Sequence, residues 1–178
     1  MAKRVFLVHG WGGSPDNDWH QWLKRELEQR GFKVEVPAMP DSLNPKITSW
    51  ISKLKDVVGK CDKDTYFVGH SIGCQAIMRY VETLSKDEKV GGIIFVAGWL
   101  HLTVDTWDEV YTQKIAAPWL NTPIDFNKIK EHIDRIVDFY SENDPYVSVT
   151  DAVLFKEKLG AKIVSVGNKK HVSGEDGI

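Results

Sequence analysis

Short apolar runs alternate along this chain with amphipathic stretches. Six of the runs are almost continuously apolar and end at turn residues; they cover 4–8, 33–37, 65–69, 91–98, 135–140 and 161–166. Runs of this length without a polar face are typical of strands buried on both sides, as in parallel sheets. The pattern therefore predicts six buried strands.

The segments between these runs carry apolar residues every three or four positions, the period of a helix. The expected stripes are Trp19, Trp22, Leu23 and Leu27; Ile47, Trp50, Ile51, Leu54 and Val58; Ile72, Ala76, Ile77, Tyr80, Val81 and Leu84; and Val153, Phe155 and Leu159. We expect the second helix to start at Asn44-Pro45, Thr150 to cap the last helix, and Gly31 and Gly160 to end helices.

Strand and helix alternate through all 178 residues, without an internal repeat or linker. This alternation predicts a single domain over residues 1–178 with an α/β fold. We expect a three-layer, doubly wound, mostly parallel six-stranded sheet with right-handed crossovers.

The segment between Gly98 and Asp125 departs from this rhythm because it is too long for a simple connection. It contains Trp99, Trp107, Tyr111 and Trp119. It is either a helix with an irregular lead-in or a cap over a site, and the sequence leaves both open. We expect an apolar, aromatic substrate pocket lined by Trp11, Trp99 and Trp119.

Charge and composition narrow the class of partner. The formal net charge is −2, which does not favour a polyanionic partner, so we expect no nucleic acid. No apolar stretch approaches the ~20 residues of a membrane span, and the run at 5–8 is too short for a signal peptide. Cys61 and Cys74 match no zinc or redox pattern and fit reduced thiols. We therefore expect a cytoplasmic protein that does not bind membranes.

Polar and glycine-rich segments follow four of the predicted strands. They read His9-Gly10-Trp11-Gly12-Gly13, His70-Ser71-Ile72-Gly73, Ser141-Glu142-Asn143-Asp144-Pro145 and Asn168-Lys169-Lys170-His171. In open parallel sheets, ligands bind outside the carboxyl ends of the strands, where strand order reverses. An order 2-1-3-4-5-6 would put the first and third strands, and hence the first two segments, beside each other at that point.

These segments supply the groups that acyl transfer needs. Ser71 would be the nucleophile, His171 the base and Asp144 the carboxylate that orients the base. Ser71 lies in a Gly-x-Ser-x-Gly sequence, which chance alone can supply, so its partners must support it. The backbone N–H groups of Ile72 and Trp11 would form the oxyanion hole.

The chain order serine, acid, histidine is that of α/β-hydrolases. His171 is the one histidine that follows Asp144. Glu142 and Asp138 are rival carboxylates, and we favour Asp144 because the turn at Pro145 would direct it back over the sheet edge.

Other chemistries fit the same residues less well. A dinucleotide-binding loop would need glycines at 10, 12 and 15, but position 15 is Pro15, and no Walker loop occurs. The histidines are scattered, so we expect no metal and no cofactor. His20, His101 and His132 are expected to be surface or packing residues. Cys74 is expected to be a small buried side chain.

The motifs HGWGG, GHSIG and SENDPYV, with the late histidine, resemble the small serine hydrolases related to retinoblastoma-binding protein nine and the bacterial YdeN-like proteins. VPAMPDSLNP and PWLNTPIDFNKIK extend the resemblance over nearly the whole chain. It implies a compact α/β-hydrolase fold without a large lid, with Ser71, Asp144 and His171 as the triad.

Two features depart from that family. Lys170 stands where the family usually has glycine before its histidine, and the family usually continues into a terminal helix, which leads us to expect a mobile histidine loop. The Leu-x-Cys-x-Glu motif of pocket-protein ligands is absent, so retinoblastoma binding does not transfer.

The sequence thus predicts a cofactor-free serine hydrolase that cleaves small carboxylic esters through an acyl-enzyme. A thioesterase or peptidase with the same triad is the alternative enzyme. A protein-interaction module with a vestigial site is the alternative from another class. The sequence identifies neither a protein partner nor the acyl length.

Overall fold

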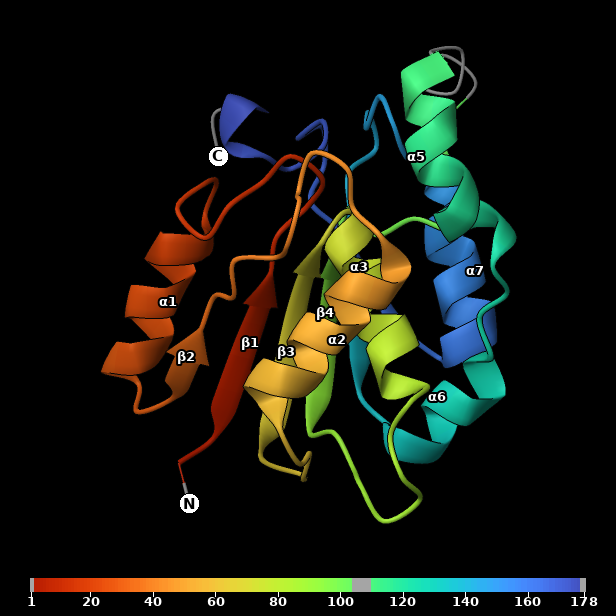
Figure 1. Ribbon diagram of the computed structural model, residues 1–178. Coiled ribbons are helices and arrows are strands. Elements are labelled where there is room, and N and C mark those ends of the chain that lie inside the picture. The colour runs from red at the N-terminus through yellow and green to blue at the C-terminus, as the bar shows by residue number, and fades with distance from the viewer. Residues whose placement is uncertain (1, 104–109, 177–178) are drawn as a thin grey trace.

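The computed structural model describes residues 2–103 and 110–176. Its strands form one sheet in the order β2-β1-β3-β4-β5-β6, and every neighbouring pair is parallel (Figure 1). The strands are β1 (Arg4–Val8), β2 (Lys33–Glu35), β3 (Thr65–His70), β4 (Gly92–Val96), β5 (Ile136–Tyr140) and β6 (Lys162–Ser165). The predicted α/β fold and strand order are confirmed.

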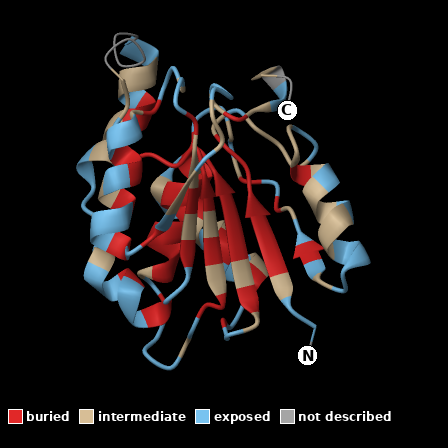
Figure 2. Ribbon diagram, turned by 180° about the vertical axis from the view of Figure 1, so that it is seen from behind, coloured by how far each residue is buried: buried red, intermediate tan, exposed pale blue. Residues whose placement is uncertain are grey.

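Helices cover the two faces of the sheet unequally. They are α1 (His20–Gln29), α2 (Ile47–Val58), α3 (Ile72–Val81), α5 (Val110–Asn121), α6 (Phe126–His132), α7 (Val149–Leu159) and the short 3₁₀ helix η1 (Gly174–Asp176). In Figure 1, α2 and α3 lie in front of the strands, and the view from behind in Figure 2 shows α1 beside an otherwise open sheet. Right-handed crossovers produce this division, because the chain turns back after β2.

Strand β1 shows why the apolar runs are continuous. Phe6 and Val8 belong to the larger core under α2 and α3. Val5 and Leu7 belong to the smaller core under α1. Because both faces of the strand are covered, successive residues are all apolar.

Helix ends differ from the prediction by one or two residues. Ser148, not Thr150, is the N-cap of α7, and its side chain accepts a hydrogen bond from the Thr150 N–H. Helix α2 begins at Ile47 rather than at Asn44-Pro45. Gly160 does end α7 in a left-handed conformation. Trp22, predicted to lie in the stripe of α1, is instead 56% exposed.

The long segment after β4 contains a helix. Helix α5 covers Val110–Asn121, and Trp107 lies outside the described residues. The helix also contributes Tyr111 and Thr112 to the wall of a cavity described below, so both readings of the segment hold in part. Within residues 2–103 and 110–176, no helix combines the length and apolar character needed to cross a bilayer.

Candidate active site

The Ser71 turn joins β3 to α3 with a strained backbone. Ser71 has φ 53° and ψ −123°, in the left-handed half of the Ramachandran map that a non-glycine residue rarely adopts. The flanking glycines are required by close approach. A Cβ at Gly73 would lie 2.3 Å from the Val8 carbonyl oxygen, and one at Gly69 would lie 2.8 Å from the Cys74 nitrogen. Glycine is therefore needed on both sides of Ser71 because α3 starts against the ends of β1 and β3.

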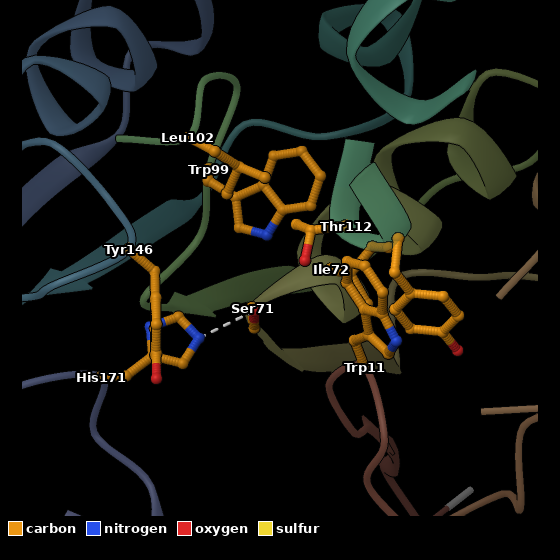
Figure 3. Close-up of a pocket in the computed structure, with 9 residues that line it drawn as sticks. Trp11, Ser71, Ile72, Trp99, Leu102, Thr112, Tyr146 and His171 are labelled. Atoms are coloured by element: carbon orange, nitrogen blue, oxygen red, sulfur yellow. Dashed lines mark hydrogen bonds between the residues drawn. The ribbon is translucent and has the colours of Figure 1, made fainter. Parts of the chain in front are cut away.

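The structure brings Ser71, His171 and Asp144 into one hydrogen-bonded chain. His171 Nε2 lies 2.9 Å from Ser71 Oγ (Figure 3), and His171 Nδ1 lies 2.8 Å from Asp144 Oδ2. An ionised carboxylate only accepts, so Nδ1 carries the proton and Nε2 can take the proton of Ser71. These are the distances that a nucleophile, its base and an orienting acid require.

The side chain of Asp144 is 2% exposed and fully partnered. Its second oxygen, Oδ1, accepts hydrogen bonds from the backbone N–H groups of Tyr146 (2.9 Å) and Val147 (3.1 Å). The rival carboxylates lie elsewhere. Glu142 accepts a hydrogen bond from the Ser165 hydroxyl, and Asp138 is buried within β5.

The loop that carries His171 is held by hydrogen bonds from several elements. Lys170 and Val172, which flank the histidine, both have left-handed backbones, at φ 44° and 54°. The anchoring bonds run from Lys169 N to Ser141 Oγ (2.9 Å), Lys170 N to Asn143 Oδ1 (2.8 Å), His70 Nε2 to the His171 carbonyl (2.9 Å), Trp19 Nε1 to the Val172 carbonyl (3.0 Å) and Gly174 N to Asp18 Oδ1 (2.6 Å).

His70 is neutral in this arrangement. Desolvation, with a further contribution from the neighbouring His171, lowers the pKa of His70 to about 4. Because its Nε2 donates to a carbonyl, its Nδ1 bears a lone pair and no proton. His9 is also buried, and desolvation lowers its pKa. The Met39 N–H donates to His9 Nε2, which joins the loop after β1 to the chain beyond β2.

Two backbone N–H groups are available for an oxyanion at Ser71. Ile72 is the first residue of α3, so no carbonyl one helical turn earlier accepts from its N–H. The Trp11 N–H has no hydrogen-bond acceptor among the described residues. Both residues line the same cavity as Ser71.

This cavity has a volume of about 380 Å³ and mostly apolar walls. Trp11, Trp99 and Leu102 stand around Ser71 in Figure 3, with Thr112 of α5 and Tyr146 beside them. We call it the apolar cavity. The Tyr146 ring meets the His171 ring edge-on, with centroids 5.0 Å apart.

Trp119 does not line the apolar cavity, contrary to expectation. It is 1% exposed, its Nε1 donates to the Pro45 carbonyl at 2.9 Å, and its ring packs edge-on against Trp50. Tyr111, Thr112 and Leu102 take part in the cavity wall instead. An aromatic residue in an amphipathic segment gives no signal that separates these two positions.

No cluster of three or more His, Cys, Asp or Glu suited to a metal ion occurs in the described part of the chain. His20 and His132 are packed inside the protein, whereas the exposed ring of His101 bonds to Asp151. Cys74 is fully buried, and desolvation raises the pKa of its thiol well above the ordinary value.

Comparison with known proteins identifies the family of this chain. The sequence pattern of the family described as Serine hydrolase matches residues 5–178. YdeN of Bacillus subtilis is 30% identical over 179 residues, covering 99% of this chain and 90% of that protein. The serine hydrolase RBBP9 of Rattus norvegicus is 29% identical, covering 94% of this chain and 86% of the rat protein.

Solved structures show the same fold. The crystal structure of the B. subtilis ydeN product superposes with a TM-score of 0.88 at 27% identity, covering 99% of this chain and 91% of that one. The carboxylesterase CesB of B. subtilis has a TM-score of 0.63 at 12% identity, covering 96% of this chain and 78% of CesB, which is a likeness of fold alone. On the match over residues 5–178, this chain belongs to the serine hydrolase family.

Proposed function

We propose that the protein hydrolyses small carboxylic esters through an acyl-enzyme on Ser71. His171 Nε2 removes the Ser71 proton as Oγ attacks the ester carbonyl, and Asp144 stabilises the imidazolium that forms. The N–H groups of Trp11 and Ile72 bind the negative oxygen of the tetrahedral intermediate. His171 then protonates the leaving oxygen, and water releases the acid by the same steps in reverse order.

The observation that carries this proposal is the hydrogen-bonded chain from Ser71 to Asp144 at the edge of a cavity. Its two links are 2.9 and 2.8 Å long, so the base needs no rearrangement before it can act. The apolar wall of Trp99, Leu102 and Ile72 suits a short hydrocarbon acyl group. The name carboxylesterase, borne by a protein of the same fold, supports esters as the first substrates to test.

An active-site probe tests the nucleophile. A fluorophosphonate should label the wild-type protein and the Ser52→Ala variant, whose changed serine is exposed on α2, but not Ser71→Ala. We expect His171→Ala to lower kcat/KM on p-nitrophenyl butyrate by about a thousandfold or more. A folded wild-type protein that resists the probe and hydrolyses nothing would favour a vestigial site.

Matched substrates test the bond that is cleaved. Butyrate presented as an oxygen ester, a thioester and an anilide keeps the acyl group constant. We expect the highest kcat/KM on the oxygen ester. A thioester or anilide that reacts faster would make the protein a thioesterase or peptidase with the same triad.

A further inference from the structure

A second cavity, of about 280 Å³, also reaches Ser71 and has mostly polar walls. It shares Trp11, Ser71, Tyr146 and His171 with the apolar cavity. The residues that distinguish it include Gly12, Gly13, Asn17, Asp18, His70 and Ser173. We call it the polar cavity. Ser71 therefore borders two cavities, one with mostly apolar walls and one with mostly polar walls.

Asp18 gives the polar cavity its charge, since it is the one acidic or basic residue, histidines aside, among the described residues that line it. Its Oδ1 accepts from the Gly174 N–H, which holds the carboxylate in place. Its Oδ2 accepts no hydrogen bond from any residue that the structure describes. The side chain is 15% exposed, so this oxygen belongs to a carboxylate that is largely shielded from solvent yet not satisfied by the protein.

His70 adds a second acceptor beside Asp18. The residue is 4% exposed, and its Nδ1 is buried without a hydrogen-bond partner in the described structure. Nδ1 lies 3.9 Å from Asp18 Oδ2, which is too far for a hydrogen bond. Because Nε2 carries the ring proton, both facing atoms are acceptors. Because Nδ1 is enclosed, Asp18 Oδ2 is the acceptor that a ligand can reach, and His70 offers it no donor.

The position of His171 indicates which part of the substrate enters each cavity. The base must reach the leaving oxygen to protonate it. His171 borders both cavities, and the polar cavity also borders Ser173 of the same loop and His70, which bonds the His171 carbonyl. The apolar cavity is bounded by Ile72, whose N–H would hold the carbonyl oxygen, and by Trp99. The leaving group therefore belongs in the polar cavity and the acyl group in the apolar one.

We propose that the polar cavity is a leaving-group subsite, in which Asp18, to which His70 offers no donor, selects alcohols that carry a further hydrogen-bond donor, such as a hydroxyl or ammonium group. The substrate class is then an apolar acyl group esterified to a polar, donor-bearing alcohol. This inference rests on the proposed ester hydrolysis, and the donor must lie on the alcohol rather than on the acid.

Three butyrate esters test the proposal on the wild-type protein. Propyl butyrate and 2-hydroxyethyl butyrate differ by a methyl against a hydroxyl, and butyrylcholine has a positive charge without a donor. A hydrogen bond to a charged group predicts that kcat/KM is about tenfold higher for the hydroxyethyl ester than for the propyl ester. Butyrylcholine should show less than half of that gain. Equal rates on the propyl and hydroxyethyl esters, or a choline ester that matches the hydroxyethyl ester, would overturn the proposal.

Asp18→Asn tests the assigned residue. The amide oxygen can still accept from the Gly174 N–H, so the base loop keeps its anchor, while the acceptor toward the cavity becomes a donor. We expect the ratio of kcat/KM on the hydroxyethyl ester to kcat/KM on propyl butyrate to fall by about tenfold, over and above any loss that the two esters share. Asp16→Asn removes the same charge from an exposed residue outside the cavity and should change neither value.

Equal losses on both esters in Asp18→Asn would assign Asp18 to the base loop alone and overturn the subsite. Propyl 3-hydroxybutyrate places the hydroxyl on the acid, and an Asp18-dependent gain there would reverse the assignment of the two cavities. The proposed function fails separately, if the wild type hydrolyses none of these esters and resists the fluorophosphonate. If the protein hydrolyses propyl butyrate through Ser71 and shows no preference for the hydroxyethyl ester, only the leaving-group subsite is contradicted.

Discussion

The proposed nucleophile and its proposed base are held in place by different means. Ser71 sits in a turn that is defined by main-chain packing, where α3 abuts the ends of two strands through Gly69 and Gly73. His171 sits in a loop with left-handed residues on both sides, and side chains from other elements hold it by hydrogen bonds.

The difference is one of which residues must be of a given kind. In the Ser71 turn these residues lie within five positions, from Gly69 to Gly73, and they pack against main-chain atoms such as the Val8 carbonyl. In the loop that carries His171, Lys170 bonds to Asn143, which lies 27 residues earlier in the chain. Val172 bonds to Trp19, which lies 153 residues earlier. Changes in the serine turn should therefore damage folding, because they disturb the packing of the sheet. Changes at the anchors should damage turnover more than folding.

The largest expected effect comes from Gly73→Ala. The new methyl group would press on the Val8 carbonyl oxygen, so we expect the free energy of unfolding to fall by about 3 kcal/mol or more, with loss of probe labelling. Gly31→Ala is the control, since its Cβ meets nothing within 4 Å and only its positive φ is unfavourable. It should lose about 1–2 kcal/mol. Equal losses in urea unfolding would contradict the role assigned to close packing.

Asp138→Asn should change how the free energy of unfolding depends on pH without changing how the rate depends on pH. Desolvation, with a smaller contribution from Asp151, raises the pKa of Asp138 to about 7, so the folded protein keeps a proton that the unfolded chain has released. Its contribution to stability is greatest below the ordinary pKa of aspartate and declines as the pH rises toward 7. The variant lacks this decline. Relative to the wild type, we expect it to gain about 2–3 kcal/mol of unfolding free energy between pH 5 and 8.

The pH–rate profile of Asp138→Asn should match that of the wild type, because the residue lies within β5 and outside the hydrogen-bonded chain of Ser71. Urea titrations at several pH values and steady-state rates on one ester provide the two measurements. A shifted rate profile would show that the sheet interior and the base are coupled.

Asn143→Ala tests the side-chain anchors of the loop that carries His171. The variant removes the acceptor for the Lys170 N–H, next to the histidine. We expect kcat to fall by about tenfold while the free energy of unfolding falls by only about 1 kcal/mol, since misplacement of a base affects rate more than stability. Asn127→Ala, at an exposed position of α6, should leave both values unchanged. A loss of several kcal/mol with an unaltered kcat would place Asn143 in the fold and not in the site.

The smallest expected effect is a gain. Lys170→Gly replaces a left-handed lysine by the residue that tolerates φ 44°. Its ammonium lies 3.6 Å from Asp176 but is 62% exposed, so little is lost with it. The relief of backbone strain is partly offset because glycine has more conformational entropy in the unfolded chain. We expect the free energy of unfolding to rise by about 0.5 kcal/mol and kcat to stay within about twofold of the wild type. A tenfold fall in kcat would show that the lysine side chain positions the base.

Much of this site follows from local rules applied to the sequence. Apolar runs, helical periods and the carboxyl-end rule place Ser71, Asp144 and His171 on one sheet edge, and the structure has them in hydrogen-bond contact. The remainder depends on contacts that leave no local pattern. Asp18 accepts from the main-chain N–H of Gly174 and Trp19 donates to the main-chain carbonyl of Val172, and main-chain groups have no residue identity to recognise.

Aromatic residues and helix caps show a second limit of sequence reasoning. Trp99 and Trp119 look alike in the sequence, yet the first lines the apolar cavity and the second packs against Trp50. Ser148 and Thr150 are both good caps, and two residues separate them. In each case, packing around the residue decides between choices that local chemistry leaves equal.

The carbonyl oxygen of Leu43 has a consequence for how this protein tolerates mutation. It accepts hydrogen bonds from Trp11 Nε1 at 3.0 Å and from Tyr111 Oη at 2.9 Å, so both of its lone pairs are used. Its own side chain is 67% exposed. The segments around residues 11, 43 and 111 are thus joined through a main-chain atom that every amino acid supplies. The side chain at position 43 can therefore be replaced without loss of the hydrogen bonds that hold the loop with the Trp11 N–H.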